Sequence, residues 1–176
     1  DEGRRGLERP DFVWHCLLVS FSRRGGSKGY EGLILDRSNY DRVTFDELRL
    51  LDNETFIARV DLALRRARVR RPSRKAEWLS LNARIVADMG GLATAKEVAL
   101  AQRGGAAKTA FMRRFHGITP MYARNIWMDA YHSDFHESIA IDGRIKRVTA
   151  LLGHDFSQYD EHERFYLDIA HEAELL

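Results

Sequence analysis

The sequence predicts an all-α fold, and three observations support this. The chain holds only three prolines, the residues that interrupt helices most strongly. Apolar residues recur every three to four positions along most of the 176 residues, which is the period of a helix. No pair of segments alternates in the way that predicts paired strands. With 44% apolar and 31% charged residues, the chain can form one unit with a core.

The first predicted helix covers Phe12 to Phe21 and is apolar on nearly every side, so we expect it to be buried at the centre. Thr44 and Glu47 have the spacing of a capping box and predict the start of a short helix. Thr94 and Glu97 predict another in the same way.

Two longer helices are predicted between these capping boxes. Residues 54–68 place apolar side chains on one stripe. Ser73 is expected to cap the next helix, which ends at Gly90 and Gly91. The remaining elements are short and are expected at residues 95–103, 106–115, 120–131, 142–152 and 158–174.

Charge is unevenly distributed although the formal net charge is only +2. Residues 65–75 hold seven Arg or Lys in eleven positions, whereas residues 158–176 are acidic. A basic segment of this kind attracts phosphates, and it is equally typical of a solvated helix end.

Cys16 is the one cysteine, which excludes an intrachain disulfide and cysteine-based zinc or iron–sulfur sites. We expect it to be a buried, inert thiol. No apolar run is long enough to span a membrane, and no signal-peptide pattern opens the sequence. We therefore expect a soluble intracellular monomer, in the cytoplasm and nucleoid or in the nucleus.

The segment Phe115–Ala123 is expected to form a tight turn between two helices. Gly117 lies where the chain must reverse, and Pro120 suits the first turn of the second helix. The free amides at that helix start can bind a phosphate, and arginines including Arg124 flank it. An ordinary turn between helices has the same pattern.

Asp142 follows Gly117 by 25 residues, which leaves room for one helix and a short loop. A carboxylate beside a sugar carbon stabilises the positive charge that develops when an N-glycosidic bond breaks. Asp142 also suits the N-cap of the next helix, and the two roles are compatible.

Segment 115–123 resembles the hairpin L-P-G-[IV]-G-x-x-[TS]-A of helix-hairpin-helix DNA glycosylases. Gly117, Ile118 and Ala123 match it. The other positions depart from it: Phe115 stands in the leucine position, His116 in that of the proline, Thr119 in that of the second glycine and Tyr122 in that of Thr/Ser.

Residues 138–148 are similar to the acidic motif of the same family, [VLI]-D-x-x-[VI]-x-R-[VI], and Asp142 falls on its catalytic aspartate. Segment 73–76 resembles the Ser-Lys-Ala segment of endonuclease III relatives. The resemblance implies a helix-hairpin-helix glycosylase-like fold: one unit, residues 1–176, built as two helical lobes with the active site in the cleft between them. Residues 30–115 would contribute the central lobe, and residues 1–29 with 116–176 the hairpin and terminal-helix lobe.

The resemblance also implies roles for individual residues. Gly117, Thr119 and Met121 of the hairpin would bind the DNA backbone together with Arg124 and Lys75. Met121 occupies the position at which bifunctional relatives carry a lysine. Because a thioether cannot form a Schiff base, β-lyase activity should be absent or weak.

Insertion into the duplex would fall to two loops. Arg23 and Arg24 stand where relatives carry an aromatic-and-glutamine loop, and Arg71 lies near the second insertion loop. An ordinary solvent loop is an equal alternative for the first of these. Trp127 and Met121 are candidates to line the base pocket, although a tryptophan on a helix more often belongs to the core.

Two clusters of histidines and acids are expected to be surface features. His132, Asp134, His136 and Glu137 fit no metal-ligand spacing, and the segment 161–163 is predicted to be a solvated helix face. No metal and no cofactor are expected.

The predicted function is that of a monofunctional DNA glycosylase in base excision repair. Its partner would be double-stranded DNA with a damaged, mispaired or modified base, which is flipped out and released by water with the help of Asp142. An inactive helix-hairpin-helix DNA-binding module is the alternative. A helical protein-interaction domain whose basic segment binds an acidic partner is a third.

Overall fold

A computed structural model describes residues 6–23 and 27–175, and within these ranges every regular element is helical. The all-α prediction is confirmed. In chain order the elements are α2 (Phe12–Arg23), α3 (Ser27–Tyr30), the π-helix η1 (Glu31–Leu35), α4 (Arg37–Asp41), α5 (Phe45–Leu48), α6 (Asn53–Arg66), α7 (Pro72–Asp88), α8 (Leu92–Ala101), α9 (Gly104–Met112), α10 (Pro120–Asp129), the 3-10 helix η2 (Ser133–Phe135), α11 (Gly143–Leu151) and α12 (Tyr159–Glu172).

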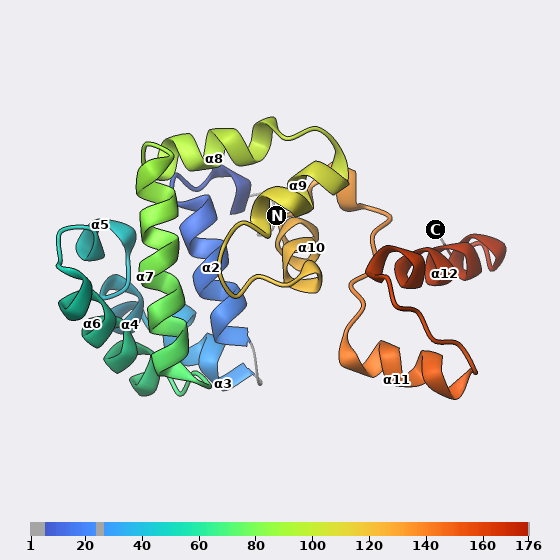
Figure 1. The fold of residues 1–176 in the computed structure, drawn as a ribbon, viewed down its shortest axis with the longest axis horizontal. Helices are drawn as coiled ribbons and strands as arrows, with labels where there is room; N and C mark the ends of the chain where they lie inside the picture. The colour runs from blue at the N-terminus through green and yellow to red at the C-terminus, as the bar shows by residue number, and fades with distance from the viewer. Residues whose placement is uncertain (1–5, 24–26, 176) are drawn as a thin grey trace.

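Helix α2 lies at the centre of the main body, as its apolar sequence predicts (Figure 1). It packs against α3, η1, α8 and α10. Trp14 is fully buried and donates a hydrogen bond from its indole nitrogen to the carbonyl of Val43, at 2.8 Å. Residues 12–23 therefore pack both against the helices that follow them and against α10.

Helices α6 and α7 form a closely packed pair beside α2 (Figure 1). Asp52 caps α6 and accepts hydrogen bonds from the amides of Glu54 and Thr55. Helix α7 begins at Pro72, so the prediction that Ser73 caps it is wrong. Proline is favoured at the first position of a helix because the amide it lacks would have had no partner there.

The two predicted capping boxes do not form as expected. Thr44 does precede α5, but its hydroxyl donates to the carbonyl of Asp41 at 3.3 Å and accepts no amide. Helix α8 begins at Leu92 after Gly91, so Thr94 lies inside the helix. The later elements start and end within a few residues of their predicted bounds.

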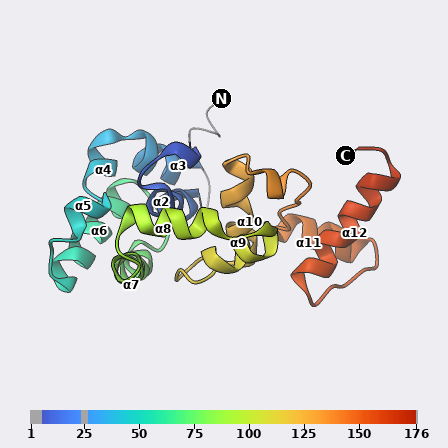
Figure 2. The same ribbon diagram turned by 90° about the horizontal axis from the view of Figure 1, so that it is seen from above.

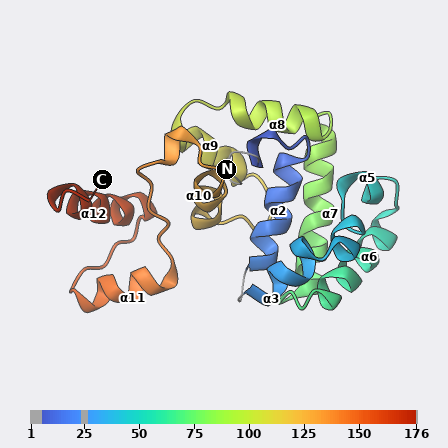
Figure 3. The ribbon, with the colours of Figure 1, turned by 180° about the vertical axis from the view of Figure 1, so that it is seen from behind.

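Helices α11 and α12 stand off the main body, on the side of α10 that faces away from α2 (Figure 1, Figure 3). Seen from above, the chain continues from the body past α10 to this terminal pair (Figure 2). Asp142 lies at the junction, as the N-cap of α11. No helix among the described residues has the length and apolar character needed to cross a membrane.

Candidate functional site

A cleft of about 1630 Å³ lies where α2, α10 and the start of α11 meet. Residues from three distant parts of the sequence line it. Helix α2 contributes His15 and Cys16, and α10 contributes Met121, Tyr122 and Asn125. The third part is the start of α11, with Asp142 directly before the helix and Arg144 in its first turn. Hairpin helix and candidate acid therefore share one concave site.

Asp142 is half-buried, with 37% of its side chain exposed. Its Oδ1 accepts hydrogen bonds from the amides of Arg144, at 2.7 Å, and Ile145, at 3.0 Å. These amide bonds, that of Ile145 first, hold the pKa of Asp142 below its usual value. Its Oδ2 lies 3.4 Å from Nε of the exposed Arg144. The carboxylate is therefore ionised at neutral pH, and one of its oxygens makes no amide bond.

Gly117 permits the hairpin turn for two physical reasons. Its φ of +82° lies in the left-handed region that side chains disfavour. A Cβ at this position would also approach Cε3 of Trp78 to 2.5 Å and Cε1 of Phe21 to 2.9 Å. The turn thus lies directly on the aromatic surface between α2 and α7.

The start of α10 presents unpaired amides. Thr119 caps the helix, and its hydroxyl accepts the amide of Tyr122 at 3.4 Å. Over residues 6–23 and 27–175, the amides of Gly117, Thr119 and Met121 have no hydrogen-bond partner. Met121 lies in the first turn of α10, at the positive end of the helix, and Thr119 and Gly117 lie just before it, so these donors are suited to bind a phosphate.

Asn82 fixes this hairpin from α7, although the sequence did not single it out for that role. Its side chain is fully buried. Oδ1 accepts the amide of His116 at 2.7 Å, and Nδ2 donates to the carbonyl of the same residue at 3.1 Å. Asn82 thus binds both backbone polar groups of His116 and holds the turn in place, and only the tertiary packing identifies this role.

We expect Asn82→Ala to destabilise the protein by about 2–3 kcal/mol, because two buried hydrogen bonds are lost and the peptide groups of His116 lose their partners. Chemical unfolding would measure this difference. Glu77→Ala is the matched control, since Glu77 is exposed on the same helix. Equal stability of the two variants would contradict this role of Asn82.

Lys75 does not lie where DNA could contact it, so its predicted role in backbone binding is wrong. It is 1% exposed, and its ammonium group donates to the carbonyl of Phe21 at 2.7 Å. The long apolar stem of Lys75 packs in the core, and its ammonium group binds a carbonyl in the last turn of α2. A cation is favoured there because the C-terminal end of a helix carries a partial negative charge.

Trp127 does not line a base pocket either. It is fully buried, stacks on Phe135 with ring centroids 6.1 Å apart, and donates its indole N–H to the carbonyl of Lys108 at 3.2 Å. Met121, the second candidate, does line the cleft.

Arg124 is held by acids of α12 rather than left free for a phosphate. Its Nε lies 2.5 Å from Oε2 of Glu163, and its Nη2 lies 2.6 Å from Oδ1 of Asp160. Its guanidinium also lies over the ring of Tyr159, 4.4 Å from the centroid. The prediction that Arg124 binds the DNA backbone is therefore not supported by its surroundings.

Glu163 and Tyr159 also bind backbone amides in the segment that leads into Asp142. Glu163 Oε1 accepts the amide of Ile139 at 2.9 Å, and the hydroxyl of Tyr159 accepts the amide of Ile141 at 2.8 Å. Glu163 is buried, as is His162, so the predicted solvated face at residues 161–163 is wrong at these two positions. Helix α12 thus positions the residues that lead into Asp142.

The residues predicted to insert into DNA have separate outcomes. Arg23 lies on the wall of the cleft, pairs with Asp129 and stacks over Tyr30 at 5.0 Å. Arg24 lies outside the described residues. Arg71 is exposed between α6 and α7, where it adopts a left-handed conformation with φ of +54°.

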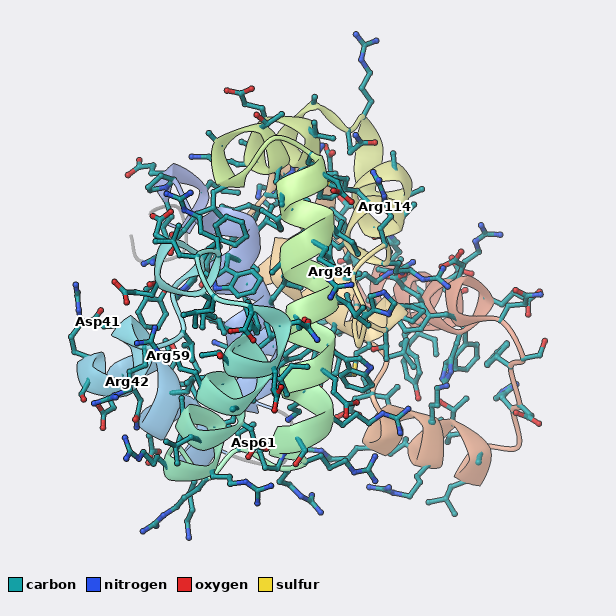
Figure 4. The ribbon with its side chains drawn as sticks, turned by 60° about the vertical axis from the view of Figure 1, so that its left-hand side comes forward. Asp41, Arg42, Arg59, Asp61, Arg84 and Arg114 are labelled. Atoms are coloured by element: carbon teal, nitrogen blue, oxygen red, sulfur yellow. The ribbon has the colours of Figure 1, made fainter. Side chains whose placement is uncertain are left out.

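Exposed arginines occur on α6, on α7, in the turn between these helices and directly after α9. Figure 4 shows Arg84 on α7 and Arg114 near α9, both away from Asp41, Arg42 and Arg59. Arg84 donates to Asn53 at 3.0 Å, whereas Arg114 is exposed beside Phe111. The other exposed arginines of these segments include Arg66, Arg68, Arg70, Arg74 and Arg113.

A second, shallow depression of about 570 Å³ lies near Asp41, Arg42 and Arg59 (Figure 4). In this depression Nη1 of Arg59 lies 3.5 Å from Oε2 of Glu47, so these two charges largely offset each other. Over the described ranges, no three His, Cys, Asp or Glu side chains are arranged to hold a metal ion. In the loop before Asp142, Asp134 instead pairs with the buried Lys108 at 2.8 Å.

Cys16 is half-buried and lines the cleft. Burial raises the pKa of its thiol far above the usual value, so it is protonated and unreactive at neutral pH.

No protein-family model, no curated protein and no solved structure matches this chain.

Proposed function

We propose that this protein is a monofunctional DNA glycosylase, which hydrolyses the N-glycosidic bond of a base extruded from double-stranded DNA. The observation that carries the proposal is the presence of Asp142 on the wall of the cleft that the hairpin helix α10 also lines. The protein would act as a monomer inside the cell, on damaged, mispaired or modified bases.

The ionised carboxylate of Asp142 supplies the chemistry. As the bond between the base and C1′ breaks, the electron pair leaves with the base and the sugar becomes an oxocarbenium-like cation. A fixed negative charge beside C1′ stabilises that cation. A water molecule then adds its oxygen to C1′, and the proton that it loses neutralises the departing base, so that the products are the free base and an abasic sugar. The lowered pKa of Asp142 suits it to electrostatic stabilisation better than to taking the proton from water.

The size of the cleft agrees with an extruded nucleotide. At about 1630 Å³ it exceeds the several hundred cubic ångströms of a typical small-molecule pocket. It therefore has room for a base and for part of the backbone that carries it. Since a duplex hides the glycosidic bond, an enzyme of this class needs that room.

The hairpin and the exposed arginines on and around α7 would hold the DNA backbone. The unpaired amides of Gly117, Thr119 and Met121 are suited to bind one phosphate, and these arginines are suited to bind the flanking phosphates. Neither set of contacts depends on base sequence.

Strand cleavage by a Schiff base is not part of the proposal. Met121 holds the hairpin position where a lysine would be required, and Lys108 is buried with its ammonium group bound to Asp134. Water is then the nucleophile, and an abasic site with an intact strand is the product.

One observation favours a second candidate function, an inactive DNA-binding module. Asp142 is a well-formed N-cap, and this role alone accounts for an aspartate at the start of α11. The hairpin amides would serve such a module equally well.

A panel of end-labelled duplexes, each with one altered base, tests the proposal. We expect at least one lesion to be released, and the strand to break only after treatment with alkali. The undamaged duplex is the control. Breakage without alkali would contradict the monofunctional mechanism, and binding of duplexes without release of any base would favour the inactive module.

A further inference from the structure

A hydrogen-bonded network reaches the cleft from the side of α2 and does not involve the hairpin or Asp142. Arg9 binds both carboxylate oxygens of Asp11, at 2.8 and 2.9 Å, and also donates to the hydroxyl of Tyr40 at 2.9 Å. The same hydroxyl lies 2.9 Å from Nδ1 of His15, whose ring lines the cleft.

The hydroxyl of Tyr40 determines which nitrogen of His15 carries hydrogen. A phenol has one hydrogen to donate and two lone pairs that accept. Its hydrogen goes to Asp11 Oδ2, at 3.1 Å, because a bond to a carboxylate is stronger than one to a neutral ring. One lone pair accepts from Arg9, so the other must accept from Nδ1–H of His15.

His15 is neutral at physiological pH. Burial, followed by the charge of Arg9, lowers its pKa to about 4, with Asp11 opposing and Arg23 adding to the effect. A neutral imidazole has one N–H, which the network places on Nδ1, and Nε2 therefore keeps a lone pair. Within the described part of the chain, Nε2 has no hydrogen-bond partner.

We propose that Nε2 of His15 accepts a hydrogen bond from an N–H group of the nucleobase that enters the cleft. The inference rests on the proposed function and adds a determinant of which bases are accepted. Bases with an N–H on the edge that meets His15 would be held, and bases that lack one would leave Nε2 buried and unpaired.

Asn125 also lines the cleft and could bind a base edge, but it does not discriminate in this way. Its amide can turn to donate or to accept, whereas the Arg9, Asp11 and Tyr40 network fixes His15 as an acceptor. His15 therefore gives the cleft a preference for bases that present an N–H group.

The tautomer is measurable on the full chain by NMR with ¹⁵N-labelled histidine. We expect Nδ1 of His15 to carry hydrogen and Nε2 to carry none. In Tyr40→Phe, which differs only by loss of the hydroxyl group, we expect both tautomers to be populated. A majority of the Nε2–H form in the unaltered protein would overturn the proposal.

Contact with the base is tested on Asp142→Asn protein, so that the base is not released. The probes are duplexes that contain uracil opposite guanine, hypoxanthine opposite thymine, 1,N6-ethenoadenine, or a tetrahydrofuran abasic site. Uracil and hypoxanthine carry a ring N–H on the exposed edge, whereas ethenoadenine and the abasic site carry none there.

We expect the Nε2 resonance to move toward the protonated range with an N–H-bearing base and to stay unchanged with the abasic site. Adding His15→Phe should weaken the affinity for the N–H-bearing duplex about tenfold and leave the affinity for the abasic duplex unchanged. His15→Gln keeps an acceptor, so its affinity for the N–H-bearing duplex should lie between that of the protein with His15 and that of the His15→Phe protein. If the duplexes bind and Nε2 does not respond, this inference fails and the role of Asp142 stands. If no duplex binds, both proposals fail.

Discussion

Replacement of Asp142 by asparagine is expected to lower the rate of base release by about 10²–10³-fold or more, because it removes the fixed charge that the proposed mechanism uses to stabilise the sugar cation. Asparagine keeps the side-chain oxygen that accepts the amides of Arg144 and Ile145, and it is as good an N-cap as aspartate. Affinity for the duplex should change little. Single-turnover release of the labelled base and DNA binding under the same conditions measure the two effects.

Asp52→Asn is the matched control for this variant. Asp52 is also an N-cap whose Oδ1 accepts two amides, those of Glu54 and Thr55, but it begins α6 and does not line the cleft. Both substitutions keep the oxygen that accepts the two amides, and Asp52→Asn also removes the acceptor of the Thr55 hydroxyl, so its effect on folding should be at least as large. Loss of base release in both would point to a general effect on structure, and release at the parent rate in Asp142→Asn would exclude Asp142 from the chemistry.

Replacement of Glu163 by alanine has the second largest expected effect. Glu163 is almost fully buried and carries the ion pair to Arg124 as well as the bond to the amide of Ile139. Without Glu163, Arg124 keeps only the exposed Asp160 as its partner and the amide of Ile139 loses its acceptor, which together should cost about 3 kcal/mol. Because α11 and α12 stand off the body (Figure 3), the loss should release the terminal pair rather than unfold the whole chain.

The released helices would no longer hold Asp142 against α10. Displacement of a reacting group by about 1 Å costs on the order of 10²-fold in rate, so base release should fall although Asp142 itself is unchanged. Hydrogen exchange of the α12 amides and single-turnover base release are the two measurements. Glu161→Ala is the control, since Glu161 is exposed on the same helix. Unchanged protection of α12 in Glu163→Ala would refute the docking role.

The elements that local chemistry specifies could be predicted from the sequence. The helices from residue 92 onward, the turn at Gly117 and the start of α11 at Asp142 lie within a few residues of their expected places. Each depends on a residue whose conformational preference acts over one turn of chain. The short helices of residues 27–41 were not predicted, because they are four or five residues long and have no apolar period of their own.

Which charged side chains are buried could not be predicted from the sequence. Lys75 lies in an exposed-looking basic segment and Glu163 in an acidic one, yet both are buried. Their partners, Phe21 and Arg124, are 54 and 39 residues away. No local pattern encodes contacts over that separation, so the wrong predictions fall on residues whose surroundings come from other helices.

By itself, the amino-acid sequence determined that this chain is all-helical, that it turns at Gly117, and that a carboxylate caps the helix after the hairpin. Only the tertiary structure decided that Asp142 and the hairpin helix share a cleft, that Asn82 holds the hairpin, and that His15 joins the wall through Tyr40. Helix starts and turns follow from backbone preferences within a few residues, whereas a site is formed by side chains that packing brings together from distant positions.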